Sequence, residues 1–275
     1  MLSRSAITSW LARPGRVARD PQGFTLIETL VAMVTGIVVT AALFAILEVS
    51  LHQSARAADV VQASQLGRAS MTRMVDELRS SCLASEFVPI QASSSNTELF
   101  FRNSYSEKAV PTSASEHKLV WNEATGALTD FTYPSNGGSW PSFTYSSAAS
   151  PTTGTLIGER ISAQGTIVVK KTETIPTPIF RYYKYATKAG NAAEDTNLPV
   201  GTLTWIELSS KETLGSTRAA EVAAVLISIR AGATDGLYTG KNGGSDGGLA
   251  DFSNQVTLAF AAPNPEAKIE DGPCQ

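Results

Sequence analysis

The sequence predicts an α+β fold, in which one long N-terminal helix packs on a head of antiparallel β-strands. No proline occurs between Phe24 and Val88, and no residue between Glu28 and Glu48 is charged. After Pro89, short runs of alternating apolar and polar residues are separated by Gly, Ser, Asn and Pro, which is typical of strands joined by turns. At 275 residues the chain is long enough to bury a core of its own.

Residues 1–23 read as a basic leader. Arginines at positions 4, 13, 16 and 19 accompany a single acidic residue, Asp20. Residues 24–47 follow as an apolar helix of about 36 Å, which is enough to cross a hydrocarbon core of about 30 Å. Because positive charges beside such a helix stay in the cytoplasm, we expect residues 48–275 to lie outside the cytoplasm.

Residues 48–88 are predicted to hold the amphipathic half of the same helix, which we expect to run over residues 24–83. One face of this half repeats apolar and small residues at helical spacing: Val60, Ser64, Gly67, Met71, Met74, Leu78 and Cys82. The opposite face is charged and holds Arg68, Arg73, Asp76, Glu77 and Arg79. Pro89 is expected to stop any helix that reaches it.

Residues 89–275 are predicted to form the β-rich head. We expect strands at residues 98–103, 178–186, 201–208, 221–231 and 253–263. The last two are the most apolar and are expected to be central. Residues 118–133 are predicted to form a hairpin with its turn at residues 122–126. Two segments rich in Gly, Ser and Thr, residues 134–157 and 234–251, are predicted to be long surface loops.

Three interpretations of the N-terminus are compared by the length of the apolar run and by the presence of the Glu28 carboxylate in it. A secretory signal cleaved at the Ala-Arg-Ala sequence of residues 55–57 would need an apolar core of 7–15 residues close to the cut, and the run here is longer. An uncleaved anchor would leave the carboxylate unexplained, although burying it in a bilayer costs about 2.5–3.5 kcal/mol. The third interpretation is a processed precursor.

The third interpretation comes from the sequence GFTLIETLVAMV, which begins at Gly23. It resembles the class III signal of type IV prepilins and pseudopilins. The resemblance implies that a prepilin peptidase cuts after Gly23 and methylates the new amine of Phe24, and that the apolar helix is retained. It also implies that Glu28 serves subunit assembly by pairing with the ammonium group of a neighbouring subunit's Phe24. The chain departs from the family at Gln22, where a lysine or arginine is usual.

The order of helix, hairpin and later strands resembles the larger minor pilins and pseudopilins of the PilW and PulJ kind. This resemblance implies a pilin-like fold and a structural subunit, not an enzyme, of a type IV pilus or a type II secretion-like filament, which helps to initiate or cap assembly. The implied partners are the prepilin peptidase, other subunits through the N-terminal helix, and the inner-membrane assembly platform. The implied location is a single-pass inner-membrane protein with an extracytoplasmic head, and the filament after assembly.

An alternative from another class is a membrane-anchored, adhesin-like binding domain that never polymerises. The sequence leaves open which machine the chain serves, whether adhesion, DNA uptake, motility or secretion. It also leaves open which subunits the chain meets, and whether it sits at the tip or in the shaft.

Motifs for catalysis and cofactors are absent from the sequence. There is no Walker loop, no G-x-S-x-G, no G-x-G-x-x-G and no paired metal-ligand cysteines, so no catalytic residue, cofactor or metal is expected. A net charge of −3 does not indicate binding to nucleic acid. The S-x-x-K match at residues 115–118 lacks its partner motifs, and His52 and His117 are expected at the surface.

Two further features leave alternatives open. Asp235, Asp246 and Asp251 lie in or beside a glycine-rich segment that is either a polar turn or a calcium site. Cys82 and Cys274 are the only cysteines, and outside the cytoplasm they are either bonded or free. In the chain-entropy model such a disulfide would stabilise the chain by around 5 kcal/mol.

Overall fold

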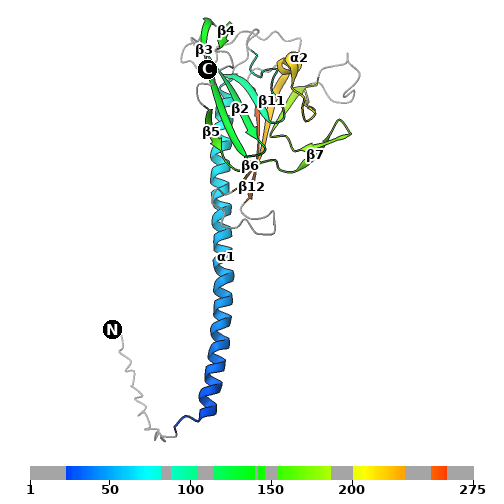
Figure 1. The fold of residues 1–275 in the computed structure, drawn as a ribbon. Helices are drawn as coiled ribbons and strands as arrows, with labels where there is room; N and C mark the ends of the chain where they lie inside the picture. Colours follow the sequence, from blue (N-terminus) through cyan, green and yellow to red (C-terminus); the bar gives the residue numbers. More distant parts are fainter. Residues whose placement is uncertain are drawn as a thin grey trace, which may run out of the picture. The chain divides into compact units, whose positions relative to one another are not determined.

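The computed structural model describes residues 23–81, 88–103, 114–139, 142–145, 154–186, 201–232 and 249–258. It confirms the α+β class, with one long N-terminal helix and antiparallel sheets (Figure 1). The chain divides into two compact units, residues 1–51 and residues 52–275, called here the first and the second unit.

Helix α1 spans Leu26–Arg79 and contributes residues to both units. It ends ten residues before Pro89, so the expectation that it continues to residue 83 was wrong. Two serines end it. The hydroxyl of Ser80 donates to the carbonyl of Glu77 at 2.6 Å, and the backbone N–H of Ser81 donates to the carbonyl of Leu78 at 3.2 Å. These contacts satisfy carbonyls of the last turn that have no partner within the helix.

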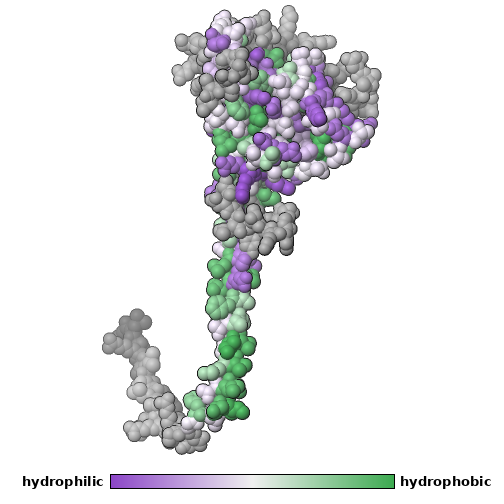
Figure 2. All heavy atoms as spheres, viewed as in Figure 1, coloured by the Kyte–Doolittle hydropathy of each residue, from purple (hydrophilic) through white to green (hydrophobic). Residues whose placement is uncertain are grey.

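The first unit contributes only exposed helix to the described structure. Every residue from Gly23 to Leu51 is exposed, and Figure 2 shows that the surface of this stretch of α1 consists mostly of hydrophobic side chains. Nothing in the described part of the unit packs against it, because the unit has no other helix or strand there. Its apolar surface is therefore uncovered.

The part of α1 in the second unit has a buried face. Its buried residues are Asp59, Ala63, Gly67, Ser70, Met71, Met74, Val75 and Leu78. The predicted stripe is confirmed from Gly67 to Leu78, and its last member, Cys82, lies outside the described residues. Its first two members are shifted by one residue. Asp59 is buried where Val60, 40% exposed, was expected. Counting back from Gly67, a step of four residues reaches Ala63 and a step of three reaches Ser64. Both steps stay on the same helical face, so periodicity alone did not distinguish the two positions.

One sheet of the second unit has the order β1-β2-β3-β4, and β5 also pairs with β3. The strands are β1 (Glu98–Asn103), β2 (Ser115–Asn122), β3 (Ala127–Ser139), β4 (Ser142–Tyr145) and β5 (Gly154–Gly158). The predicted strand at residues 98–103 and the predicted hairpin are confirmed, with Asn122 paired with Ala127 across the turn. The expected loop at residues 134–157 was wrong in part, because it contains the end of β3, all of β4 and most of β5.

A second sheet has the order β10-β9-β11-β12, and β6 also pairs with β11. The strands are β6 (Ile161–Ser162), β9 (Phe180–Tyr185), β10 (Leu203–Ile206), β11 (Val222–Gly232) and β12 (Leu249–Thr257). Strands β9, β10 and β11 match predicted ones, and β11 is central as expected. β12 shares residues 253–257 with the strand predicted at residues 253–263, whose residues 259–263 lie outside the described residues. β12 was also expected to be central, but among the described residues it is the last strand of the sheet. Its start at Leu249 lies within the expected loop of residues 234–251, and residues 234–248 lie outside the described residues.

Two small elements were missed by the sequence analysis. Strands β7 (Thr166–Val169) and β8 (Glu173–Pro176) form a separate hairpin, and the six-residue helix α2 covers Gly215–Ala220. The β7–β8 turn places Lys170 and Lys171 at φ 47° and 62°, a conformation that favours Gly or Asn. Two lysines at such a turn give no sequence signal for a hairpin.

A single main core joins α1 to both five-stranded sheets. Met71, Met74, Val75 and Leu78 of the helix belong to one buried cluster with apolar residues of β1, β2, β9 and β11. Polar contacts within the core also cross between the sheets. The hydroxyl of Tyr182 donates to the carbonyls of Ser95 and Glu98 at 2.8 and 3.0 Å. Burial raises the pKa of Tyr182 well above its ordinary value, so the group stays a donor.

Candidate functional site

The residues around the predicted cleavage point lie ahead of α1. Gly23 and Phe24 precede the first helical residue, and the Phe24 side chain is 80% exposed. A Cβ atom built on Gly23 would meet no atom within 4 Å. The fold therefore does not require a glycine at this position, and a requirement for one would come from outside the described structure.

The first turn of α1 is capped by Thr25. Its Oγ1 accepts a hydrogen bond from the backbone N–H of Glu28 at 3.3 Å, and its carbonyl accepts from the N–H groups of Glu28 and Thr29 at 3.0 and 3.2 Å. Thr25 and Glu28 have the S/T-x-x-E spacing of a capping box, a signal that is present in the sequence but was not part of the prediction. The negative charge of Glu28 also lies at the positive end of the helix dipole.

The hydroxyl groups of the apolar stretch are satisfied inside the helix. Thr29 and Thr35 donate back to the carbonyls of Thr25 and Val31 at 3.0 and 2.9 Å, and Thr40 donates to the carbonyl of Gly36. Such bonds allow threonine to lie in apolar surroundings without an unsatisfied donor. Among the described residues, α1 is the one helix long and apolar enough to cross a membrane.

The carboxylate of Glu28 is the exception in this stretch. None of the ion pairs formed among the described residues involves it, and its side chain is exposed. A carboxylate in apolar surroundings needs a cation or several donors to offset the loss of water. The predicted site residues Gly23, Phe24 and Glu28 thus lie at one helix end, and within the described part of the chain the Glu28 carboxylate has no ion-pair partner.

A buried polar network corrects the expectation for His117. The side chain of His117 is 8% exposed; the Nδ1 atom lies 3.1 Å from Oδ1 of Asp130, and Nε2 lies 3.1 Å from Oγ of Ser115. The ring also stacks on Phe101, with 5.3 Å between ring centroids. The alternating pattern of β2 places His117 on the buried face of the strand. A single histidine at such a position did not by itself indicate a buried polar network. His52 is exposed, as expected.

Ser115, His117 and Asp130 have the spacing of a serine–histidine–aspartate relay. The serine hydroxyl, however, donates to Oδ1 of Asn103, and the Asn103 amide donates to Oε2 of Glu77 on α1 at 3.1 Å. The serine hydroxyl is therefore engaged within the network. We interpret the network as a structural link between α1 and strands β1, β2 and β3.

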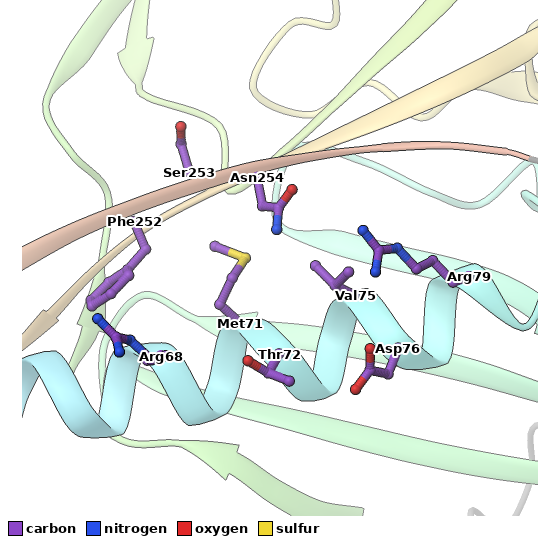
Figure 3. Close-up of a pocket in the computed structure, with 9 residues that line it drawn as sticks. All are labelled: Arg68, Met71, Thr72, Val75, Asp76, Arg79, Phe252, Ser253 and Asn254. Carbon is purple, nitrogen blue, oxygen red and sulfur yellow. The ribbon is translucent and has the colours of Figure 1, made fainter.

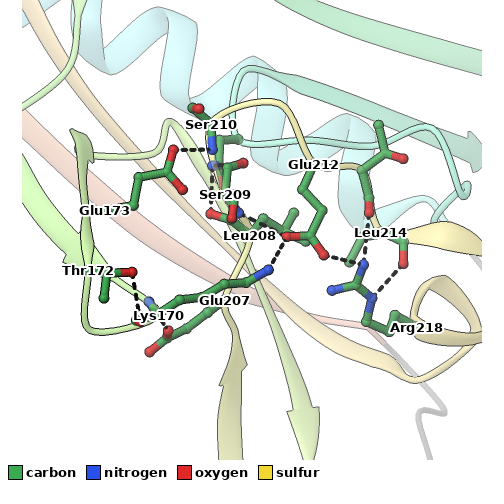
Figure 4. A network of polar contacts seen from close by, with 12 residues as sticks. Lys170, Thr172, Glu173, Glu207, Leu208, Ser209, Ser210, Glu212, Leu214 and Arg218 are labelled. Atoms are coloured by element: carbon green, nitrogen blue, oxygen red, sulfur yellow. Dashed lines mark hydrogen bonds and ion pairs between the residues drawn. The ribbon is translucent and has the colours of Figure 1, made fainter.

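An ionic cluster holds the β7–β8 hairpin against the segment before α2 (Figure 4). The carboxylate of Glu212 accepts from Nζ of Lys170, from the backbone N–H of Ser209 at 3.1 Å, and from Nη2 of Arg218 at 2.8 Å. The lysine bond, with help from Ser209 and Arg218, lowers the pKa of Glu212 to about 2. The backbone N–H of Lys170 donates to Oε2 of Glu207 at 2.6 Å. The cluster thereby stabilises a turn of unfavourable backbone conformation.

The possible calcium and disulfide sites are only partly described. The carboxylate of Asp251 accepts two hydrogen bonds from Arg230, at 2.6 and 2.9 Å, and this arginine lowers the pKa of Asp251. The Asp251 carboxylate is therefore already paired with a guanidinium group of the same chain. Asp235, Asp246, Cys82 and Cys274 lie outside the described residues. Within the described ranges, no group of three or more His, Cys, Asp or Glu residues is placed to hold a metal ion.

Comparison of the chain with protein-family models, with curated proteins and with solved structures finds no match.

Proposed function

We propose that this chain is a structural filament subunit, a minor pilin or pseudopilin of a type IV pilus or type II secretion-like filament. The observation that carries the proposal is the start of α1. An exposed apolar helical stretch with internally satisfied hydroxyls carries a carboxylate at Glu28, four residues after Phe24, which forms no ion pair among the described residues. The resemblance of that sequence to the class III signal supports the same reading.

In this proposal the apolar stretch has two successive environments. Lipid covers it first, while the precursor is anchored in the inner membrane, and the helices of neighbouring subunits cover it after assembly. Prepilin peptidase hydrolyses the peptide bond after Gly23, and the free amine of Phe24 then receives a methyl group from a methyl-donor cosubstrate of the same enzyme. The carboxylate of Glu28 then pairs with the ammonium group of a neighbouring subunit's Phe24, which offsets the cost of burying both charges.

The alternative, a membrane-anchored binding domain that does not polymerise, uses the same helix only as an anchor. It predicts no new N-terminus at Phe24. Intact-mass measurement of the native protein separates the two functions. A mass that begins at N-methyl-Phe24 supports the filament subunit, whereas an uncut chain, or one that begins at Ala58, overturns it. Retention of Gly23→Leu as uncut precursor would place the cut at the proposed bond.

Glu28 stands at the third position of the capping-box pattern and has a proposed charge role, and two substitutions separate the two explanations. Glutamine suits the third position of a capping box as well as glutamate does, but it has no charge. We therefore expect both Glu28→Gln and Glu28→Ala to be processed and inserted, yet to be absent from sheared filaments. Glu48→Ala, which removes the carboxylate at the other end of the uncharged run, is the matched control and should assemble. Filaments that contain Glu28→Gln at the wild-type level would show that capping alone explains the residue.

A further inference from the structure

A groove in the second unit lies between α1 and β12 (Figure 3). Its volume is about 370 Å³, and its lining residues are Arg68, Met71, Thr72, Val75, Asp76, Arg79, Phe252, Ser253 and Asn254. Figure 3 shows Met71 and Val75 directed from the helix toward β12, with Arg68 beside the Phe252 ring at one end and Arg79 at the other. The floor is thus apolar, and a cation stands at each end.

The wall formed by β12 is held in place by close packing on the helix. A Cβ atom on Gly67 would lie 2.2 Å from the Phe252 ring and 2.9 Å from the Cβ of Ala231. Only a residue without a side chain allows this approach. The ring therefore sits directly on the helix backbone, and the groove beside it is built into the fold.

The outer edge of β12 carries backbone groups that face away from β11. The N–H of Leu258 donates to Ala223 of the β11 side at 2.9 Å, and the N–H of Ser228 donates away from β12, to Ile179. In an antiparallel ladder these directions alternate along each strand. The N–H groups of Ser253 and Gln255 consequently point to the outer edge, where no described strand pairs with them. An exposed edge of this kind is a template for another strand.

The charges at the groove favour an acidic occupant. Arg68 and Arg79 are exposed, and neither forms an ion pair with any described residue. By contrast, Arg102, Arg218 and Arg230 of the same unit pair with carboxylates at 2.8, 2.8 and 2.6 Å. Asp76 is the one acidic residue in the lining. Two unpaired guanidinium groups are suited to binding carboxylates, because each presents a planar set of donors.

We propose that this groove binds an extended, acidic segment of a partner protein, which adds to the sheet as a strand on the outer edge of β12. Backbone bonds to the edge provide affinity, and alternate side chains provide specificity. Apolar side chains of the segment would lie along the apolar floor beside the partly buried Phe252 ring, and carboxylates at its ends would reach Arg68 and Arg79. The proposal rests on the second unit alone and holds whether or not the first unit assembles into a filament.

The spacing of the two arginines sets the length of a probe. Eleven helical steps from Arg68 to Arg79 span about 16 Å, and the six steps between the ends of a seven-residue strand span about 20 Å, a difference that the flexible glutamate and arginine side chains can bridge. A suitable probe is the acetylated, amidated peptide Glu-Thr-Val-Thr-Val-Thr-Glu with a fluorophore, in which both glutamates and both valines share one face. The matched control peptide has lysine in place of each glutamate.

Fluorescence anisotropy with the full chain in detergent micelles tests the proposal. We expect the acidic peptide to bind and the basic peptide to bind at least about tenfold more weakly. Combined Arg68→Glu and Arg79→Glu substitutions should weaken binding of the acidic peptide by about tenfold or more and reverse the preference. Arg73→Glu changes the same charge on the same helix outside the groove and should leave binding unchanged.

A backbone variant tests strand addition separately from charge. Ser253→Pro removes one outward N–H without removing a bond to β11, and proline is tolerated on a sheet edge that faces solvent. We expect it to weaken binding by about tenfold while the circular dichroism spectrum stays unchanged. Equal binding of both peptides, or unchanged binding by Ser253→Pro, would overturn the proposal.

Two other occupants give distinct results. Residues 259–275 follow β12 and hold three acidic residues and one lysine. If the acidic peptide binds only to a chain that ends at Leu258, the groove is filled by the chain's own C-terminus, and the proposal of a partner fails. If the wild type is a dimer that Ser253→Pro converts to a monomer, the occupant is a second copy, and the proposal fails likewise.

Discussion

The two parts of α1 are one continuous helix, yet they differ in what covers them. In residues 26–51 the large apolar side chains are exposed, for example Leu43 at 60% and Phe44 at 66%. In residues 52–79 the apolar face is buried, and Met74 and Leu78 are fully covered by the sheets. The helical backbone is the same in both parts, so the difference lies in whether the chain itself supplies a partner surface.

This difference shows which part of the helix lacks a packing surface within the described chain. Long helices in water are stabilised mainly by packing of an apolar face. The C-terminal part obtains that packing from its own strands and tolerates a charged outer face. The N-terminal part is apolar all round, and an all-round apolar helix is stable only inside a membrane or a larger assembly.

Truncating one leucine in each part should give the largest contrast. Leu78→Ala removes a fully buried side chain and should lower the free energy of unfolding of the second unit by about 2–5 kcal/mol, since it leaves a cavity. Leu43→Ala removes an exposed side chain and should leave that free energy unchanged within about 0.5 kcal/mol. Urea unfolding of the full chain in detergent, followed by tryptophan fluorescence, measures both. Equal effects would mean that the two parts are not stabilised differently.

The two helical glycines provide a second contrast, of intermediate size. Gly67→Leu forces a side chain into the Phe252 ring and the Cβ of Ala231, and overpacking of this kind costs about 1–3 kcal/mol. Gly36→Leu meets no atom within 4 Å in the isolated chain and should raise helix stability by up to about 1 kcal/mol. Thermal unfolding of each variant in the same detergent compares them. If Gly67→Leu unfolds at the wild-type temperature, the close contact between α1 and β12 is wrong.

Acidification should give the smallest effect, and it should act on the second unit through Glu212. The pKa of this carboxyl is lowered from 4.5 to about 2 in the folded chain. Its ion pairs therefore stabilise the fold fully above about pH 5 and are lost as the pH falls toward 2. Because the cluster is partly exposed, we expect a contribution below about 1 kcal/mol that salt reduces further. Unfolding curves between pH 6 and pH 2.5 measure it.

Glu212→Gln is the variant that isolates this contribution. It should be less stable than the wild type at pH 6, and the difference should shrink as the pH approaches 2. Glu28→Gln is the comparison in the other part of the molecule. Glu28 has no ion pair among the described residues, so its substitution should not change the pH dependence of unfolding of the second unit. A constant difference between Glu212→Gln and wild type at every pH would contradict the ion-pair explanation.

The candidate site was accessible to sequence reasoning because it is local. Gly23, Phe24, Thr25 and Glu28 lie within six residues, so both the resemblance and the capping pattern can be read from a short stretch. The capping pattern was overlooked although its signal was present. The burial of His117 could not be read in this way, because its partner Asp130 lies thirteen residues away on another strand. The arginines of the groove gave no signal, since exposed arginines on a helix are common.

The sequence by itself determined the elements whose pattern is continuous along the chain. These are the long helix, strand β1, the β2–β3 hairpin and the apolar strand β11, each specified by periodicity or turn residues over fewer than twenty residues at a time. Only the tertiary structure decided the strand order β10-β9-β11-β12, the terminal position of β12, and the strands in the Ser- and Gly-rich segment after residue 134. It also decided the turn at Lys170 and Lys171. The unfavourable backbone conformation of this turn is offset by the contacts that Lys170 makes with Glu207 and Glu212. The physical reason is that pairing and burial depend on residues far apart in the chain, whereas helical and strand periodicity depend on near neighbours.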